Sequence, residues 1–280
     1  MLSVEAIKGE IMAYDGTAIY YEKDIPEQAK AIVIIVHGFA EHLGRYEYFK
    51  DKLNDLGYGV YRFDNRGHGR SGGKKGHLQD FNYFITDADA IVEMAKNENP
   101  SVPIFMFGHS MGGFITSAYG IRYKEKLRGQ ILSGAATMKP PQVAGVKSNL
   151  FRVLNKIVPR IKVKNSLDNM ICHNQDVVKA YKEDPLNLKY ATLKFYVEFL
   201  VKGIEWLNKN MSEYNYPCLI LHGANDKIVS KQASENFYNV IKSDDKKIII
   251  YESLYHEIIN EDKKDDIVED IHIWMEERIS

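Results

Sequence analysis

One short stretch of the chain places a serine where it could act as a nucleophile. Residues 108–113 are GHSMGG, in which Gly108, Ser110 and Gly112 fit the pattern G-x-S-x-G. An apolar run, VPIFMF, precedes the pattern and small residues follow it, which predicts a strand, a sharp turn and a helix. The turn would hold the serine in a strained conformation, and larger side chains at the two glycines would collide with strand and helix. This context disfavours the alternative, a serine in an ordinary surface turn.

A serine hydroxyl is a weak nucleophile and needs a base within reach, itself oriented by an acid. With this pattern the acid and then the histidine follow the serine in the chain, each after a core strand. Asp226 follows the run CLILHG (218–223), and His256 follows the run KKIIIYE (246–252). We therefore expect Ser110, Asp226 and His256 to meet at one edge of a sheet.

The negative charge that develops on an attacked carbonyl oxygen needs two fixed donors. We expect one to be the backbone N–H of Met111, directly after the serine. The other is expected from the stretch HGFAEH (37–42), where Gly38 permits a tight turn and the N–H of Phe39 can face the site.

Other polar residues near strand ends are expected to have structural roles. His37, His109 and His222 lie beside glycines and are expected to stabilise loops. Asp64 and Arg66, in FDNRGHGRS, are expected to bind loop backbone groups or each other.

Apolar runs of strand length recur along the chain. They predict strands at 31–38, 58–64, 102–108, 128–134, 218–223 and 246–252. Helical spacing of apolar residues predicts helices at 46–56, 81–95 and 267–275. Strands that alternate with helices predict an α/β fold, a mostly parallel central sheet with helices on both faces.

The alternation breaks once. Residues 137–213 contain helical and irregular patterns but no convincing strand, so we expect an inserted helical cap there. The core is then made of residues 1–136 and 214–280.

Composition excludes several classes of function. The chain has 280 residues with a formal net charge of −1, so no overall field attracts nucleic acid. The two cysteines suggest a reducing compartment, and we find neither a signal peptide nor a run of about 20 apolar residues. We expect a cytoplasmic protein that uses no cofactor and no metal, since no H-E-x-x-H pattern occurs. Its oligomeric state stays open.

Six stretches carry a resemblance to a known family. They are HGFAEHLGRY (37–46), DNRGHGRS (64–71), GHSMGG (108–113), DPL (184–186), LHGANDKIV (221–229) and YHE (255–257). In this order the chain resembles the monoacylglycerol lipase and lysophospholipase branch of the α/β-hydrolase superfamily. The resemblance implies an α/β-hydrolase fold, the triad Ser110, Asp226 and His256, and Phe39 and Met111 as oxyanion donors. It also implies that residues 137–213 form a mobile cap over an acyl-binding channel.

One segment of the expected cap is both basic and amphipathic. Within residues 148–164 an apolar stripe is formed by Leu150, Phe151, Leu154, Ile157, Val158 and Ile161. Such a segment can make transient contact with an anionic membrane surface, peripheral to the bilayer, and deliver lipid substrates. Alternatively the stripe covers the active site and its charges are merely solvated, which is the interpretation we favour from sequence.

The expected reaction is hydrolysis of a carboxylic ester, a monoacylglycerol or lysophospholipid, through an acyl-enzyme on Ser110. The alternative is a general carboxylesterase, or a thioesterase or amidase, acting on a small non-lipid acyl substrate, because a triad does not select the leaving group. A non-catalytic receptor of this fold would be expected to have lost one of the three residues.

Overall fold

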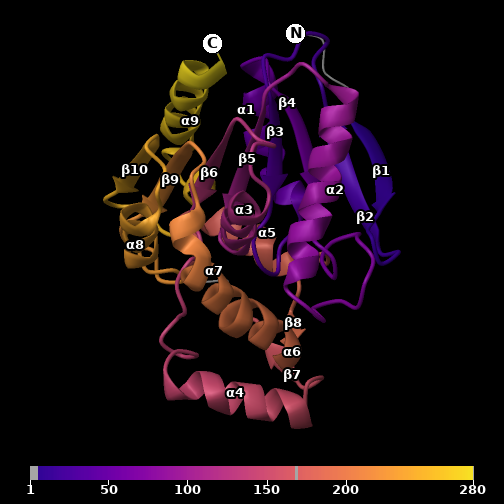
Figure 1. Ribbon diagram of the computed structural model, residues 1–280, viewed down its shortest axis with the longest axis vertical. Coiled ribbons are helices and arrows are strands. Elements are labelled where there is room, and N and C mark those ends of the chain that lie inside the picture. The colour runs from indigo at the N-terminus through magenta and orange to yellow at the C-terminus, as the bar shows by residue number, and fades with distance from the viewer. Residues whose placement is uncertain (1–5, 168–169, 280) are drawn as a thin grey trace.

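The computed structural model describes residues 6–167 and 170–279 and is built on one eight-stranded sheet (Figure 1). The strand order is β1-β2-β4-β3-β5-β6-β9-β10. These strands are β1 (Ile7–Met12), β2 (Ala18–Asp24), β3 (Ile32–Val36), β4 (Gly59–Phe63), β5 (Ile104–His109), β6 (Gly129–Ser133), β9 (Cys218–Gly223) and β10 (Lys246–Tyr251). The strands from β4 to β10 in this order pair in parallel, whereas β1 and β2 are antiparallel to their neighbours. Every strand predicted from the apolar runs is therefore confirmed.

Helices cover both faces of the sheet, which explains why its inner strands are largely apolar. On one face lie α1 (Glu47–Asp55) and α9 (Lys264–Ile279), which share a core with β3, β5 and β9. On the other lie α2 (Asn82–Glu98), α3 (Met111–Arg122) and α8 (Gln232–Val240). Every residue of β3, β4, β5, β6 and β9 is buried, as strands packed on both faces require.

The predicted insertion, residues 137–213, falls between β6 and β9, and we call it the cap segment. In Figure 1 most of it lies beyond one end of the sheet, with α4 outermost. Its elements are α4 (Val146–Ile157), β7 (Lys162–Lys164), α5 (Gln175–Glu183), β8 (Tyr190–Thr192), α6 (Leu193–Tyr196), the π-helical turn η3 (Val197–Gly203), α7 (Ile204–Asn210) and η4 (Met211–Glu213).

The expectation of no strand in the cap segment was wrong. β7 and β8 pair in antiparallel fashion, Lys162 opposite Thr192 and Lys164 opposite Tyr190. Each strand has only three residues. Such strands are too short to produce a recognisable alternation, and their pairing depends on contacts between distant parts of the chain.

The favoured interpretation of the apolar stripe was also wrong. Of its members only Phe151 packs against a buried cluster, whereas Leu150, Leu154, Ile157, Val158 and Ile161 are exposed. The physical reason is that α4 packs on α6 and η3 along one side, which leaves the apolar side without a partner in the described chain. None of the described helices is long and apolar enough to cross a membrane.

The cap segment joins the core at the loop after β3. The N–H of Leu188 donates to the carbonyl of Ala40 at 3.1 Å, and Nε2 of His42 lies 2.8 Å from Oδ2 of Asp184. The cap segment thus lies over the carboxyl edge of the sheet, where ligands bind in open α/β folds.

Candidate active site

Ser110 occupies the turn between β5 and α3, as the pattern predicts. Its backbone has φ 53° and ψ −113°, a conformation that a residue with a side chain adopts only when its surroundings impose it. The surroundings are visible in the hydrogen bonds, because Ser110 N–H donates to the Ser133 carbonyl at 2.9 Å and the Ser110 carbonyl accepts from Ala136 at 3.0 Å. The strand β6 therefore holds the turn in place.

The glycines of the pattern are required by close approach of neighbouring backbone. A Cβ added to Gly112 would lie 2.0 Å from the carbonyl oxygen of Val36, at the end of β3. A Cβ added to Gly108 would lie 2.3 Å from Oγ1 of Thr116 on α3. A side chain at Gly112 would thus collide with a strand and one at Gly108 with a helix, which is the reason predicted from sequence for the two glycines.

Asp226 and His256 come together in the loops that follow β9 and β10. Nδ1 of His256 lies 2.6 Å from Oδ2 of Asp226. The other carboxylate oxygen, Oδ1, accepts from the backbone N–H groups of Ile228 and Val229 at 2.8 and 2.9 Å. Since Nδ1 must carry its proton to bond the carboxylate, Nε2 is left as the basic nitrogen of His256.

Both titratable groups have shifted pKa values. Burial alone would lower the pKa of His256. The Asp226 carboxylate and its hydrogen bond, together with the charges of Glu257 and Glu41, raise this pKa by more, so the net shift is upward. Burial would raise the pKa of Asp226, but the nearby imidazoles of His256 and His222 hold it well below its usual range. These two shifts favour an ionised Asp226 carboxylate beside a His256 imidazole that readily takes up a proton.

The His256 ring lies beside the turn that carries Ser110. Its centroid is 4.6 Å from that of His109, and its Nδ1 lies 3.2 Å from the position that a Cβ on Gly134 would take. Within the described chain no hydrogen bond of the Ser110 hydroxyl is found, so the link from serine to histidine is not closed in this state. Such links are often long in enzymes without substrate.

The two expected oxyanion donors lie on either side of the same turn. Met111 begins α3, so its N–H is among those that a helix leaves unpaired. Phe39 follows Gly38, and a Cβ on Gly38 would be 3.2 Å from the Ser110 Cβ. Neither N–H donates to another backbone or side-chain group of the described residues.

Sequence reasoning missed the carboxylate that holds the Phe39 loop. Oε1 of Glu41 accepts from the Gly38 N–H at 2.5 Å and from the Tyr46 hydroxyl at 2.7 Å. Arg45 then bridges Glu41, at 3.2 Å, and Glu257, at 2.5 Å, the residue after His256. Glu41, Arg45, Tyr46 and Glu257 all belong to stretches that carried the family resemblance, which was the signal for their importance.

Sequence reasoning also missed a second partner of Asp226. Nε2 of His222 lies 3.1 Å from Oδ2 of Asp226 and 2.9 Å from the carbonyl oxygen of Val229. Both neighbours are acceptors, so Nε2 carries a proton and donates. Nδ1 of the same ring lies 2.7 Å from Oγ of Ser234. His222 stabilises a loop, as expected, and that loop is the one that carries Asp226.

The remaining sequence assignments have mixed outcomes. Asp64 binds loop backbone, accepting from the N–H groups of Leu43 and Arg70 at 2.8 and 2.6 Å, as expected. Among the described residues the Arg66 side chain does not bind loop backbone or Asp64; it forms ion pairs with Asp87 and Asp15. The sequence could not show this, because these carboxylates come from elements remote in the chain.

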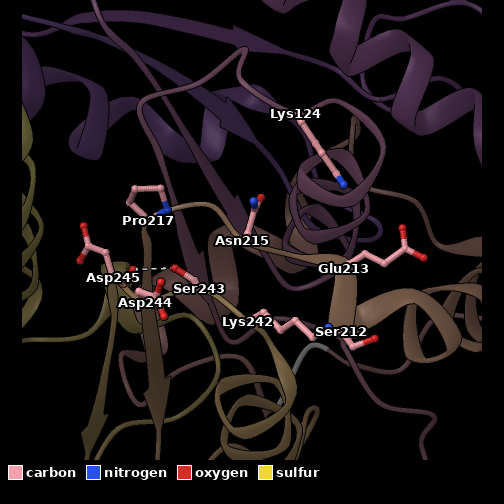
Figure 2. A pocket seen from close by; sticks show the side chains of 9 residues that line it. All are labelled: Lys124, Ser212, Glu213, Asn215, Pro217, Lys242, Ser243, Asp244 and Asp245. Carbon is pink, nitrogen blue, oxygen red and sulfur yellow. Dashed lines mark hydrogen bonds between the residues drawn. The ribbon is translucent and has the colours of Figure 1, made fainter.

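A hollow of about 610 Å³ lies at the edge of the sheet where β9 and β10 begin, opposite the edge where Asp226 and His256 lie (Figure 2). Its lining includes Asn215 and Pro217, just before β9, and Asp245, just before β10. Since Asp226 and His256 follow the other ends of these two strands, this hollow is remote from them. We assign it no part in the chemistry.

Comparison with protein families matches residues 27–263 to the family described as serine aminopeptidase, S33. The chain belongs to this family. The family has the α/β-hydrolase fold, which confirms the fold expected from sequence. A monoacylglycerol lipase of Mycolicibacterium smegmatis is 33% identical over 262 residues, 93% of each chain. A phospholipase of Bacillus subtilis is 30% identical over 244 residues, 85% of this chain and 92% of its own.

A solved structure agrees with this membership of the serine aminopeptidase family. The crystal structure of a monoacylglycerol lipase from Paleococcus ferrophilus superposes with a TM-score of 0.82 at 31% identity, covering 92% of this chain and 98% of its own. The cap segment lies inside residues 27–263, the part of the chain that the family match covers.

Proposed function

We propose that Ser110, Asp226 and His256 form the catalytic triad of a carboxylic ester hydrolase. Nε2 of His256 takes the proton from the Ser110 hydroxyl as the oxygen attacks the ester carbonyl carbon. The N–H groups of Phe39 and Met111 stabilise the resulting oxyanion. The bond to the alcohol then breaks, His256 returns the proton to the departing oxygen, and a water activated by His256 releases the acid from Ser110.

One observation carries the proposal: a buried Asp226–His256 pair beside a serine held at positive φ. Asp226 fixes the His256 ring and leaves Nε2 as its basic nitrogen. The strained turn presents Ser110 at the start of α3, whose positive dipole end lies toward developing negative charge. These are the parts that nucleophilic acyl transfer requires.

Replacement of Ser110 tests the proposal directly. Ser110→Ala is expected to reduce turnover of a short chromogenic ester by roughly four to six orders of magnitude. Ser117→Ala is the matched control, since Ser117 lies on α3 and its hydroxyl donates, among the described residues, to the Gly113 carbonyl alone. Near-wild-type turnover by Ser110→Ala would place the nucleophile elsewhere.

Monoacylglycerols or lysophospholipids are the substrate class that we assign to the enzyme. The support is that a monoacylglycerol lipase and a phospholipase are each at least 30% identical to it over most of its length. Aromatic side chains of the cap segment also reach the oxyanion loop, since the Phe39 ring lies 5.0 Å from that of Phe195 and 5.5 Å from that of Tyr196. Such surfaces suit an acyl chain.

A substrate panel distinguishes this class from the alternatives. It contains mono-, di- and triacylglycerols, lysophospholipids, and aryl esters, thioesters and amides of graded chain length. We expect the highest kcat/KM for single-chain lipid esters. Preference for short non-lipid substrates would instead favour a general carboxylesterase, thioesterase or amidase.

We also infer that residues 137–213 act as a mobile cap that makes transient contact with a membrane surface. Along α4 the side chains of Val146, Leu150, Val153 and Ile157 are 86%, 57%, 54% and 71% exposed and lie on one helical face. An apolar helical face beside basic residues is typical of helices that lie in the lipid interface. Sedimentation with anionic vesicles tests this, and Leu150→Ser with Ile157→Ser should abolish binding.

A further inference from the structure

We propose that a basic hollow in the cap segment binds the phosphate of an anionic lipid headgroup. This hollow, which we call the cap pocket, has a volume of about 610 Å³. It is lined by His77, Gln79, Arg152, Asn155, Lys156, Pro159, Arg160, Lys194, Val197 and Lys202. The inference rests on the proposed membrane contact and names the chemistry of the lipid that the contact selects.

Basic side chains outnumber the carboxylates that face them in the cap pocket. Arg152 donates to Glu205 at 2.8 Å. Lys202 and Lys194 share Glu198, at 2.6 and 3.4 Å from its Oε1. Two carboxylates thus serve three of the five basic residues that line the pocket.

The other two basic residues, Lys156 and Arg160, have no ion pair with any described residue. Both are exposed, and both line the pocket from the end of α4 and the turn that follows it. Two cations free to donate into one hollow are suited to a phosphate, which offers several strong acceptor oxygens.

The pKa of His77, which also lines the pocket, reflects the same excess of positive charge. The pKa of His77 is lowered, first by burial and then by the charges of Lys74, Lys194 and Arg160. Nδ1 of His77 already bonds Oγ1 of Thr192 at 3.0 Å. This lowered pKa disfavours a charged His77 ring, so the positive charge of the pocket comes mainly from its lysines and arginines.

The position of the cap pocket selects a lipid as the source of that phosphate. Lys156 and Arg160 alternate in sequence with Ile157, Val158 and Ile161, which are 71%, 41% and 55% exposed. In Figure 1 α4 lies at the end of the molecule farthest from the two chain ends. When the apolar face of α4 enters the acyl boundary, cations beside it lie at the level of the headgroups.

The test compares two pairs of charge-removing substitutions. The pocket variant carries Lys156→Gln and Arg160→Gln. The control variant carries Lys162→Gln and Lys164→Gln, which remove the same charge from exposed residues of β7 outside the pocket lining. Two types of phosphatidylcholine vesicle are compared at matched surface charge. One contains phosphatidylglycerol, whose charge is on a phosphate, and the other contains cholesteryl hemisuccinate, whose charge is on a carboxylate.

We expect the wild-type enzyme to bind the phosphatidylglycerol vesicles more tightly than the carboxylate vesicles. The pocket variant should lose about tenfold or more in affinity for the former, and with it the preference. The control variant should weaken on both vesicles alike and keep the preference. Equal binding of the two vesicle types by wild type, or equal losses by the two variants, would overturn the proposal.

Two further arms identify the source of the phosphate and separate this proposal from the catalytic one. Tight binding of free glycerol phosphate without any preference among vesicles would assign the pocket to a soluble ligand and overturn the proposal that it binds a lipid headgroup. Turnover of a short soluble ester should be retained by both charge variants, which also verifies their folding. Ser110→Ala should keep the vesicle preference, so failure of either proposal is recognisable on its own.

Discussion

The negative charge of Asp226 raises the pKa of His256. This shift predicts how activity depends on pH. His256 must be neutral at Nε2 to accept a proton, and its pKa is raised above the usual value of about 6.5. We expect kcat/KM for a neutral short ester to fall as the pH decreases through this raised pKa. Asp226→Asn removes the negative charge, so the acidic limb should move to lower pH while turnover falls. A pH–rate profile with its acidic limb well below pH 6 in the wild type would contradict this.

The contact between His222 and Asp226 predicts a positioning role for His222. His222→Ala removes one donor from the carboxylate and opens space beside it, so Asp226 can rotate away from His256. We expect kcat to fall roughly ten- to a hundredfold with little change in KM.

His222→Gln serves as the conservative control, because its amide can still donate to the carboxylate. Rotation of Asp226 away from His256 in His222→Ala should also move the acidic limb of the pH profile to lower pH. His222→Gln should recover part of the lost kcat and return that limb toward its wild-type position. If His222→Ala lowered only thermal stability and left kcat and the pH profile unchanged, the residue would have a structural role alone.

At the scale of elements, the contact between β3 and the start of α3 determines the shape of the turn. Gly112→Ala would place a Cβ 2.0 Å from the Val36 carbonyl oxygen and 2.8 Å from that of His37. We expect a free energy of unfolding lower by about 1–3 kcal/mol, measured by urea denaturation, together with a loss of ester turnover.

Gly145→Ala is a suitable control for the glycine substitution. Gly145 precedes α4 with φ 60°, and an added Cβ there meets nothing within 4 Å. This substitution should cost only the strain of its backbone conformation and should leave turnover of a soluble ester intact. Equal turnover in both alanine variants would show that the turn tolerates displacement of α3.

At the scale of the whole molecule, Arg45 connects three separate parts. It bonds Glu41 in the loop after β3 and Glu257 beside His256, and its guanidinium lies 4.8 Å from the ring centroid of Tyr181 in the cap segment. Arg45→Ala leaves two buried carboxylates without this partner. We expect the free energy of unfolding to fall by about 3–5 kcal/mol in urea denaturation.

Two comparisons make the Arg45 result specific. Arg45→Lys keeps the charge but cannot bridge both carboxylates with a planar fork, so an intermediate loss is expected. Arg122→Ala removes an exposed arginine that bonds Asn82 and should change stability by less than about 0.5 kcal/mol. A cost for Arg45→Ala no larger than that of Arg122→Ala would contradict the role of this network.

The sequence alone determined the six strands that pair in parallel in the sheet and which three side chains are candidates for catalysis. Buried strands are continuous apolar runs, and the residues that follow parallel strands must meet at one edge, so local patterns predicted both. The short strands β7 and β8 were beyond such patterns because three residues hold too little periodicity.

Only the tertiary structure decided the partners of the catalytic candidates and the direction that α4 faces. Periodicity shows that a residue is apolar on one side of a helix, but not whether another element covers that side. Arg45 and Glu257, or His42 and Asp184, are remote in the chain, and hydrogen bonds between such residues depend on how the elements pack. That dependence is why the sequence named Ser110, Asp226 and His256, whereas the link from Arg45 to Glu257 and the exposed face of α4 required the fold.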